Sequence, residues 1–255
     1  MALMHLDFKS DILKMAMSMD VILPERAALK KTGKMKVLYL LHGMSDDHTI
    51  WQRRTSVERY ITVNNYNILT VMPNAHRSFY TDMSEGADYW RYVSEEIPGI
   101  IKTYFNISTK REDTFAAGLS MGGYGAMKLA LRLPHKFAAG ASLSGAVDPE
   151  RFGRSFEGTE TALEFRRTFG DLDNFSGSEN DLFHLSSTLA KSGKPRPSIF
   201  QCCGTEDFLY ADNIKFKKHL KKLKFDLHYE EGPGTHEWGY WDKQIQKVLQ
   251  WLPLS

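Results

Sequence analysis

Short strand-like runs alternate along the chain with segments that repeat apolar residues at helical spacing. Strand-like runs cover residues 36–43, 66–74, 114–120, 137–145, 197–203 and 224–231. Helical spacing covers residues 89–105 (despite Pro98), 121–133, 212–224 and 241–252. The first two runs are almost unbroken in their apolar character, which is typical of parallel strands buried on both faces. The alternation therefore predicts an α/β fold, with a mostly parallel central sheet and helices on both faces.

One segment, residues 148–196, departs from this alternation. It is rich in charged residues, Gly and Ser, with short apolar patches between them. An excursion from the carboxyl end of a strand in an open α/β sheet overhangs the ligand crevice. The segment is therefore either a lid or pocket wall, or a surface elaboration without a functional role. We expect residues 1–255 to form one domain that carries this lid-like insertion.

Charge and hydropathy bear on the class of partner. Lys and Arg total 33 against 31 Asp and Glu, so the net charge of +2 marks no nucleic-acid-binding surface. The densest basic run, residues 215–225, has helical spacing, which favours a solvated helix face over an anion-binding patch. No apolar run approaches the length of a membrane span. We expect neither a nucleic acid nor a membrane as partner, and homo-oligomer formation is left open.

The start of the chain and its two cysteines bear on the compartment. The first 25 residues lack the basic start, continuous apolar core and cleavage site of a secretory signal. Cys202 and Cys203 are adjacent in a strand-like run, so their side chains point to opposite faces. This excludes a disulfide framework and a cysteine-based zinc site. We expect a reduced, cytoplasmic location, with leaderless export left open.

Residues 114–131, TFAAGLSMGGYGAMKLAL, place a serine between a strand and a helix. Gly118, Ser120 and Gly122 form the pattern G-x-S-x-G, and Gly123 follows it. In this context the pattern indicates a nucleophile elbow, a sharp turn that leaves no room for side chains beside the nucleophile. The turn exposes the hydroxyl and brings the N-terminal amides of the helix near it. The alternative is a glycine-rich turn in which Ser120 only caps the helix.

A serine nucleophile needs a base and a group that orients the base. Asp207 follows the strand-like run at 197–203 and precedes a helix, the order in which an α/β-hydrolase places its acid. Glu206 is the nearest rival, whereas Asp212 is better explained as a helix N-cap. Most of the nine histidines fall within or beside strands and helices. His236 instead follows the last strand, after a Gly-Pro-Gly turn, and is the predicted base.

The tetrahedral intermediate that forms when a serine attacks a carbonyl also needs N–H donors for its oxyanion. The backbone N–H of Met121, directly after the nucleophile, is one predicted donor. The other should come from the loop after the strand at 36–43, where Met44 follows Gly43. This loop departs from the HGGG form of many lipases, which leaves the second donor open. A serine triad needs no cofactor, and no H-x-E or C-x-x-C spacing suggests a metal site.

Four segments together carry a family resemblance: YLLHGMSDD, GLSMGGYGAMKLAL, CGTEDFLY and GTHEWGYW. They resemble the esterase D and tributyrin esterase branch of the α/β-hydrolases, which also includes feruloyl esterases and S-formylglutathione hydrolases. The resemblance covers nearly the whole chain and is strongest to bacterial tributyrin esterases, which act on short-chain and acetyl esters. It implies Ser120 as nucleophile, Asp207 as acid and His236 as base, with Met44 and Met121 as oxyanion donors.

These residues predict a serine carboxylesterase that works through an acyl-enzyme intermediate. Bulky side chains are expected to rim the nucleophile beside Gly43 and to restrict the acyl group to acetyl through butyryl: Met44, Met121, Tyr124 and Trp238. The alcohol side should accept larger groups, including sugars. The alternatives are an S-formylglutathione-type thioesterase, a feruloyl esterase and an inactive scaffold that serves as a binding module. Leu119 disfavours the thioesterase, because the family's thioesterases usually have His before the serine.

Overall fold

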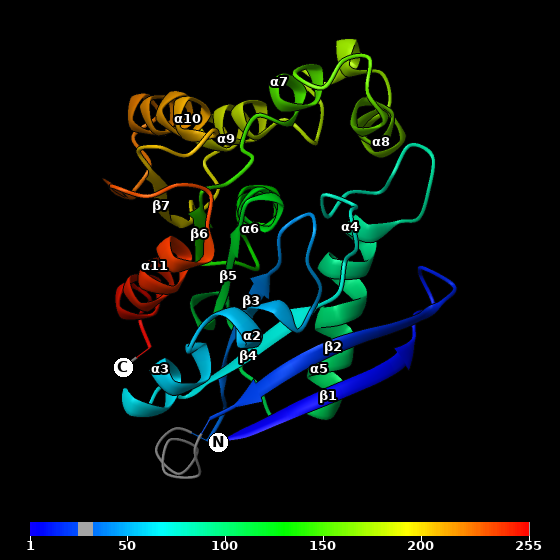
Figure 1. Ribbon diagram of the computed structural model, residues 1–255. Coiled ribbons are helices and arrows are strands. Elements are labelled where there is room, and N and C mark those ends of the chain that lie inside the picture. The colour runs from blue at the N-terminus through cyan, green and yellow to red at the C-terminus, as the bar shows by residue number, and fades with distance from the viewer. Residues whose placement is uncertain (25–32, 255) are drawn as a thin grey trace.

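The computed structural model describes residues 1–24 and 33–254. Within them, eight strands form one sheet in the order β1-β2-β4-β3-β5-β6-β7-β8 (Figure 1). The parallel part contains β4 (Ile68–Pro73), β3 (Lys36–Leu41), β5 (Thr114–Leu119), β6 (Ala139–Leu143), β7 (Ser198–Gly204) and β8 (Leu227–Gly232). One edge is completed in antiparallel pairing by β2 (Ala16–Leu23) and β1 (Ala2–Lys9). The predicted α/β fold with a mostly parallel sheet is therefore confirmed.

The antiparallel edge formed by β1 and β2 is absent from the sequence prediction. Polar residues alternate with apolar ones along β1, and most of its side chains are exposed. Only Leu6 and Phe8 of this strand pack against the core. A strand with one solvated face lacks the continuous apolar run that identifies the inner parallel strands. Its exposed polar side chains also protect the edge of the sheet from pairing with another chain.

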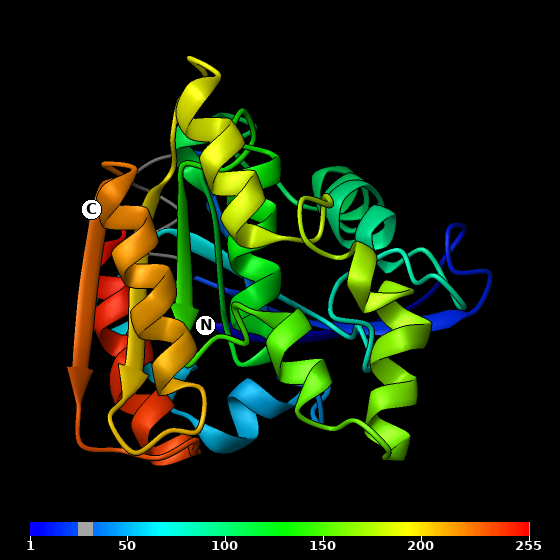
Figure 2. The same cartoon turned by 90° about the horizontal axis from the view of Figure 1, so that it is seen from above.

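Helices cover both faces of the sheet (Figure 1, Figure 2). One face packs against α5 (Ile97–Tyr104), α6 (Met121–Arg132), α9 (Leu182–Lys191) and α10 (Tyr210–Lys222). The other packs against α2 (Ile50–Arg54), α3 (Val57–Val63) and α11 (Trp238–Trp251). Successive residues of β3 alternate between the two cores, as the pleat of a strand requires. In the described part of the chain, no helix combines the length and apolar character that a membrane crossing requires.

The helical pattern predicted over 89–105 becomes three consecutive segments. These are α4 (Tyr89–Arg91), the π-helical η1 (Tyr92–Glu96) and α5. The π-helical turn ends at Glu96, two residues before Pro98, which has no backbone N–H to donate to the preceding turn. A widened turn at this place lets the chain stay helical on both sides of the proline. A short 3-10 turn, η2 (Arg111–Asp113), then leads into β5.

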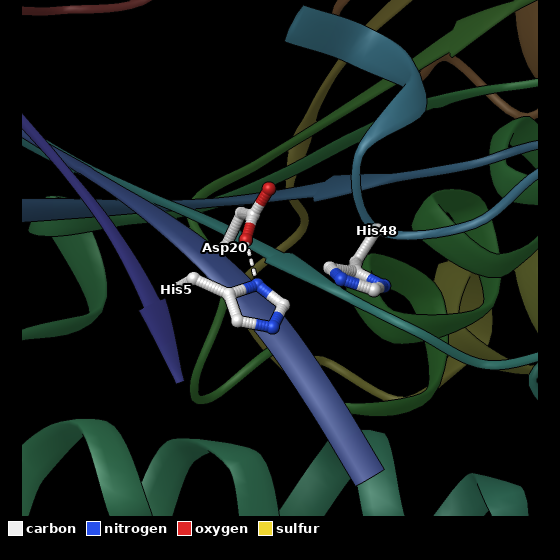
Figure 3. Close-up of side chains that lie close together, drawn as sticks. All are labelled: His5, Asp20 and His48. Atoms are coloured by element: carbon white, nitrogen blue, oxygen red, sulfur yellow. Dashed lines mark hydrogen bonds and ion pairs between the residues drawn. The ribbon is translucent and has the colours of Figure 1, made fainter. Parts of the chain in front are cut away.

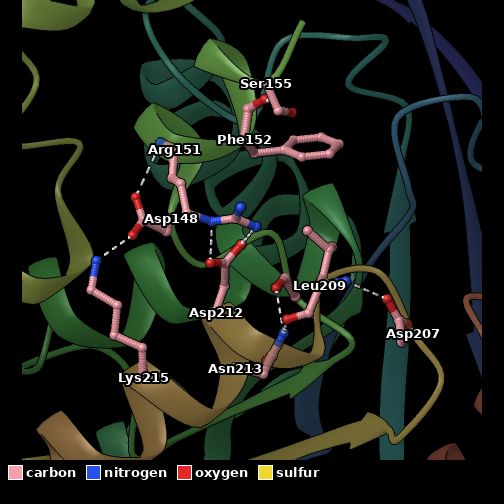
Figure 4. A network of polar contacts seen from close by, with 10 residues as sticks. Asp148, Arg151, Phe152, Ser155, Asp207, Leu209, Asp212, Asn213 and Lys215 are labelled. Carbon is pink, nitrogen blue, oxygen red and sulfur yellow. Dashed lines mark hydrogen bonds and ion pairs between the residues drawn. The ribbon is translucent and has the colours of Figure 1, made fainter.

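The segment 148–196 leaves the sheet after β6 and returns at β7. It contains α7 (Pro149–Arg154), α8 (Glu160–Phe169), the 3-10 turn η3 (Leu172–Asn174) and α9. Phe165 of α8 is buried in the core, and Phe169 packs against the same core. The segment is therefore helical and packed onto the domain, and ion pairs join its first helix to α10 (Figure 4).

Candidate active site

Ser120 lies in a sharp turn between β5 and α6 with a backbone conformation that is rare for serine. Its φ is 52° and its ψ is −119°. A Cβ added at Gly118 would lie 2.3 Å from the carbonyl oxygen of Gly122, and one added at Gly122 would lie 2.3 Å from that of Leu41. Both are backbone atoms that cannot move aside. The two glycines of G-x-S-x-G are thus required by the close approach of the turn to its surroundings.

The strained turn is held by hydrogen bonds to neighbouring segments. The Ser120 N–H donates to the carbonyl oxygen of Leu143 over 3.0 Å. The Ser120 carbonyl oxygen accepts from the N–H of Ala146 at 3.0 Å and of Tyr124 at 3.1 Å. Strain of this kind persists only where the surrounding structure enforces it, and it is concentrated at functional sites.

The structure brings Ser120, His236 and Asp207 together from three distant parts of the chain. His236 Nε2 lies 3.0 Å from Ser120 Oγ, and His236 Nδ1 lies 2.8 Å from Asp207 Oδ2. The Asp207 side chain is fully buried, whereas that of His236 is 18% exposed. With its Nδ1–H donating to Asp207, the imidazole keeps a lone pair on Nε2 for the serine proton. This is the arrangement by which a triad makes a serine hydroxyl nucleophilic.

The acid next to His236 is Asp207 and not its neighbour Glu206. Asp207 Oδ1 also accepts the backbone N–H of Leu209 at 2.8 Å, which orients the carboxylate. Glu206 is exposed and accepts the N–H of Gly234 at 2.6 Å, and this hydrogen bond lowers the pKa of its carboxyl. The prediction that Asp212 caps a helix is wrong: the N-cap of α10 is Leu209, and Asp212 lies within the helix and pairs with Arg151.

The loop after β3 is held by the buried His42. Its Nδ1 donates to the carbonyl oxygen of Gly43 at 2.7 Å, and its Nε2 accepts the N–H of Ala75 at 2.9 Å. Tyr80 Oη donates to the His42 carbonyl oxygen at 2.9 Å. Burial lowers the pKa of His42 to about 4, so the imidazole is neutral at pH 7. The sequence shows His42 only as the end of a buried strand, yet it orients the loop at Gly43 and Met44.

Two side chains expected at the rim of the site lie elsewhere. Tyr124 is fully buried, donates to the carbonyl oxygen of Asn180 at 2.8 Å and does not line the cavity at Ser120. The Met121 side chain is also buried in the core. Because α6 begins at Met121, its side chains turn into the domain, and the prediction that these two rim the nucleophile is wrong. Met121 is the first residue of α6, so its backbone N–H has no acceptor within its own helix.

Ser120 and His236 open into a cavity of about 300 Å³. The predicted residues Gly43, Met44 and Trp238 line it. Its wall also contains aromatic side chains that the sequence analysis does not identify: Phe79, Phe152, Phe208 and Trp241. The His236 ring lies between two of these, 4.5 Å from the Phe208 ring and 4.8 Å from the Trp241 ring between centroids. The cavity is small and mostly apolar.

Comparison with models of known protein families shows which family this chain belongs to. The Esterase model matches residues 10–252. The chain belongs to the Esterase family. It is 33% identical to an acetyl esterase of Caldicellulosiruptor saccharolyticus, over 99% of this chain and 98% of that protein.

Two solved structures from Staphylococcus aureus are also similar to this esterase over nearly its whole length. The fluorophosphonate-binding serine hydrolase F (FphF) has a TM-score of 0.89 at 34% identity, covering 98% of both chains. The S-formylglutathione hydrolase FrmB has a TM-score of 0.87 at 34% identity, also covering 98% of both. The family resemblance is confirmed, and the protein is a serine hydrolase acting on carboxylic ester bonds.

The segment 148–196 contributes to the wall of this esterase's cavity through Phe152. Figure 4 shows how its first helix is attached: Arg151 forms a two-pronged ion pair with Asp212 of α10. A second pair joins Lys215 Nζ of α10 to Asp148 Oδ2 over 2.7 Å. Asp148 Oδ1 meanwhile caps α7 by accepting the N–H of Arg151. Of the two interpretations left open by the sequence, these contacts favour a pocket wall over a surface elaboration.

One carboxylate lies on the cavity wall, that of Asp46. Its N–H donates to the carbonyl oxygen of Gly43 at 3.2 Å, in the turn that also contains Met44. Burial raises the pKa of this carboxyl. Asp46 thus places a carboxylate beside the aromatic side chains of the pocket, where it can accept hydrogen bonds from a bound molecule.

Proposed function

We propose that this esterase hydrolyses short-chain carboxylic esters, from acetyl to butyryl, with Ser120 as nucleophile, His236 as base and Asp207 as the acid that orients the base. The observation that carries the proposal is the continuous hydrogen-bonded sequence from Ser120 Oγ through both ring nitrogens of His236 to Asp207. It opens into the cavity, where a substrate carbonyl can reach the hydroxyl.

The reaction follows from this geometry. His236 Nε2 takes the Ser120 proton as Oγ attacks the ester carbonyl, and the imidazolium formed is stabilised by Asp207. The N–H groups of Met121 and Met44 stabilise the oxyanion. Collapse of the intermediate expels the alcohol, which takes the proton from His236 and leaves an acyl-enzyme. Water then attacks the acyl group by the same steps and releases the acid and the free serine.

The size and lining of the cavity support the limit on acyl length. Each methylene that the wall can bury gains about 0.8 kcal/mol, and a chain that no longer fits forces the packed wall apart at a greater cost. Aromatic side chains form much of the wall around a space of about 300 Å³. The acetyl esterase relative supports the same choice, as the name of that protein describes its activity on acetyl esters.

The alcohol portion is proposed to be neutral and hydroxylated, as in an acetylated sugar. Trp238 supplies a broad apolar face for stacking a ring, and Asp46 supplies an acceptor for its hydroxyl groups. A feruloyl ester would place its aromatic acid in the acyl pocket and is the less favoured alternative. S-formylglutathione is a second candidate because FrmB is similar, although the Asp46 carboxylate repels the anionic glutathione and Leu119 stands where His is usual.

The proposal is tested with a serine-directed fluorophosphonate and p-nitrophenyl acetate. The wild-type protein should bind one equivalent of probe at Ser120 and hydrolyse the ester, whereas Ser120→Ala should do neither. A folded Ser144→Ala variant is the matched control, since Ser144 also has a positive φ but does not line the cavity. Full labelling of Ser120→Ala would overturn the nucleophile assignment, and a wild-type protein that is inert to both reagents would support the binding module. Comparing kcat/KM for acetylated xylose, methyl ferulate and S-formylglutathione ranks the substrate classes.

A further inference from the structure

Away from the catalytic residues, His5, Asp20 and His48 converge from three segments (Figure 3). His5 comes from β1, Asp20 from β2 and His48 from the loop between β3 and α2. One ligand atom from each side chain lies within 4.8 Å of the other two. His5 Nδ1 is 2.7 Å from Asp20 Oδ1, and the rings of His5 and His48 are 5.1 Å apart between centroids.

The buried imidazole of His48 lacks hydrogen-bond partners among the described residues. Both of its ring nitrogens are buried, and neither has a hydrogen-bond partner among the described residues. A neutral imidazole carries one N–H donor and one lone pair, so leaving both unpaired away from water costs free energy. The ring nevertheless faces His5 and Asp20, as Figure 3 shows. A cation between the three side chains would use the His48 lone pair.

Neighbouring residues orient the other two ligands as metal sites require. His5 Nε2 lies 3.3 Å from Asp7 Oδ1, so an N–H on Nε2 leaves the lone pair of Nδ1 directed at Asp20. Asp20 Oδ2 accepts from Gln52 Nε2 at 2.8 Å, which leaves Oδ1 for an ion. A carboxylate behind a metal-binding histidine and a hydrogen bond to a metal-binding carboxylate are the usual outer partners of metal ligands.

We propose that His5, Asp20 and His48 bind a divalent transition-metal ion of the zinc class. Two imidazoles and one carboxylate suit Zn²⁺, whereas Mg²⁺ and Ca²⁺ prefer oxygen ligands alone. Ligand atoms around a tetrahedral zinc lie about 3.4 Å apart, from bond lengths of about 2.1 Å. To bind the ion, His48 approaches the other two ligands by at most about 1.4 Å, and the atoms of His5 and Asp20, now 2.7 Å apart, separate by about 0.7 Å. The His5 side chain is 51% exposed, which gives an ion a path in and room for a water as fourth ligand.

A metal ion at this position would link two separate segments of the fold. The ion joins the antiparallel edge of β1 and β2 to the loop that begins at Gly43 and Met44 and ends at α2. This inference is independent of the proposed esterase mechanism, since none of the three ligands lines the catalytic cavity. A ligand that binds only the folded state stabilises it, so the ion should raise the midpoint of thermal unfolding. The sequence conceals the site because its ligands come from separate segments and match no short motif.

The test uses the full chain freed of metal with a chelator. Isothermal titration with Zn²⁺ should give one site, the midpoint of thermal unfolding should rise with Zn²⁺ and not with Mg²⁺, and Co²⁺ should give the visible spectrum of a tetrahedral nitrogen–oxygen site. His48→Ala and His5→Ala should each weaken Zn²⁺ at least about tenfold, and Asp7→Asn by about tenfold, since outer partners alone are typically worth 10- to 100-fold.

His228→Ala is the matched control, because His228 is a surface histidine paired with Glu230 at 3.1 Å, and it should bind as the wild type does. His48→Gln serves if His48→Ala does not fold. Unchanged Zn²⁺ affinity in folded His5 and His48 variants would overturn the proposal. So would a site that is lost in His236→Ala and kept in His48→Ala, because the ion would then bind at the catalytic histidine.

Discussion

The ring of Phe152 lies stacked on the ring of Phe208, with centroids 5.8 Å apart and planes 19° apart. Phe152 belongs to the helical excursion after β6, and Phe208 follows the acid Asp207. Phe208 in turn contacts the ring of His236. The excursion is thereby connected to the proposed base through two aromatic contacts, and changes in its attachment should be measurable in catalysis.

Loosening the attachment of α7 should weaken substrate binding more than it weakens chemistry. Arg151→Ala leaves the buried Asp212 carboxylate without its ion pair, and the half-exposed position of Arg151 limits the expected cost to about 1–2 kcal/mol of unfolding free energy. KM for p-nitrophenyl butyrate should rise several-fold with a smaller change in kcat. Arg154→Ala, which breaks only exposed pairs with Glu150 and Asp173, is the control and should change both quantities little. Equal effects of the two variants would contradict this account.

Removing the Phe152 ring should lengthen the acyl chain that the pocket accepts. The two methylenes that separate a butyryl from a hexanoyl ester are worth about 1.6 kcal/mol when they can be buried, or about tenfold in kcat/KM. In Phe152→Ala, the ratio of kcat/KM for hexanoyl over acetyl p-nitrophenyl esters should therefore rise about tenfold. Leu163→Ala, at an exposed position of the same excursion, should leave the ratio unchanged. An unchanged ratio in Phe152→Ala would place this ring on the alcohol side.

The two adjacent acids should respond differently to neutralisation. Asp207→Asn removes the carboxylate that orients His236 and stabilises its charged form, so kcat should fall by orders of magnitude in a folded protein. Glu206→Gln keeps an oxygen that can accept the Gly234 N–H and should retain most of the rate. Steady-state kinetics of both variants, with near-identical circular dichroism spectra, make the comparison. A crippled Glu206→Gln beside an active Asp207→Asn would mean that the acid is misassigned.

Folding stability should fall in acid through His42. Its pKa is about 4 when folded and 6.5 ordinarily, so between these values the unfolded chain binds a proton that the folded chain does not. The free energy of unfolding therefore decreases as pH drops from 6.5 to 4, by about 3 kcal/mol from this group at about 1.4 kcal/mol per pH unit.

The measurement for His42 is denaturant unfolding at pH 7 and pH 4.5. His42→Gln cannot titrate, so it should lose less stability between the two pH values than the wild type, even though it starts from a lower value. All other groups titrate in both proteins, so the difference between their two losses of unfolding free energy is due to His42. Parallel losses in the two proteins would show that the buried imidazole does not resist protonation.

The sequence by itself determines the inner strands, the elbow and the order of the triad residues, because these features depend on neighbours along the chain. The inner strands carry continuous apolar runs because both of their faces are buried, and their positions follow from the sequence. The elbow is equally local: Gly118 and Gly122 lack side chains because a Cβ at either position would lie 2.3 Å from a backbone oxygen. The order of Ser120, Asp207 and His236 identifies the triad as a hypothesis, since each follows a strand of the predicted sheet.

Only the tertiary structure decides which way a side chain points among distant segments. Glu206 and Asp207 are adjacent carboxylates. They have different roles because Glu206 accepts a hydrogen bond from Gly234, whereas Asp207 is hydrogen-bonded to His236. Tyr124 turns into the core, whereas Phe152 reaches the cavity from an excursion that the sequence shows only as charged and irregular. The hydrogen bond from the Ala75 N–H to His42 and the approach of His5 to His48 likewise join residues that no local pattern relates. Such contacts depend on how strands and loops pack in three dimensions, because packing selects one orientation from several that the local sequence allows equally.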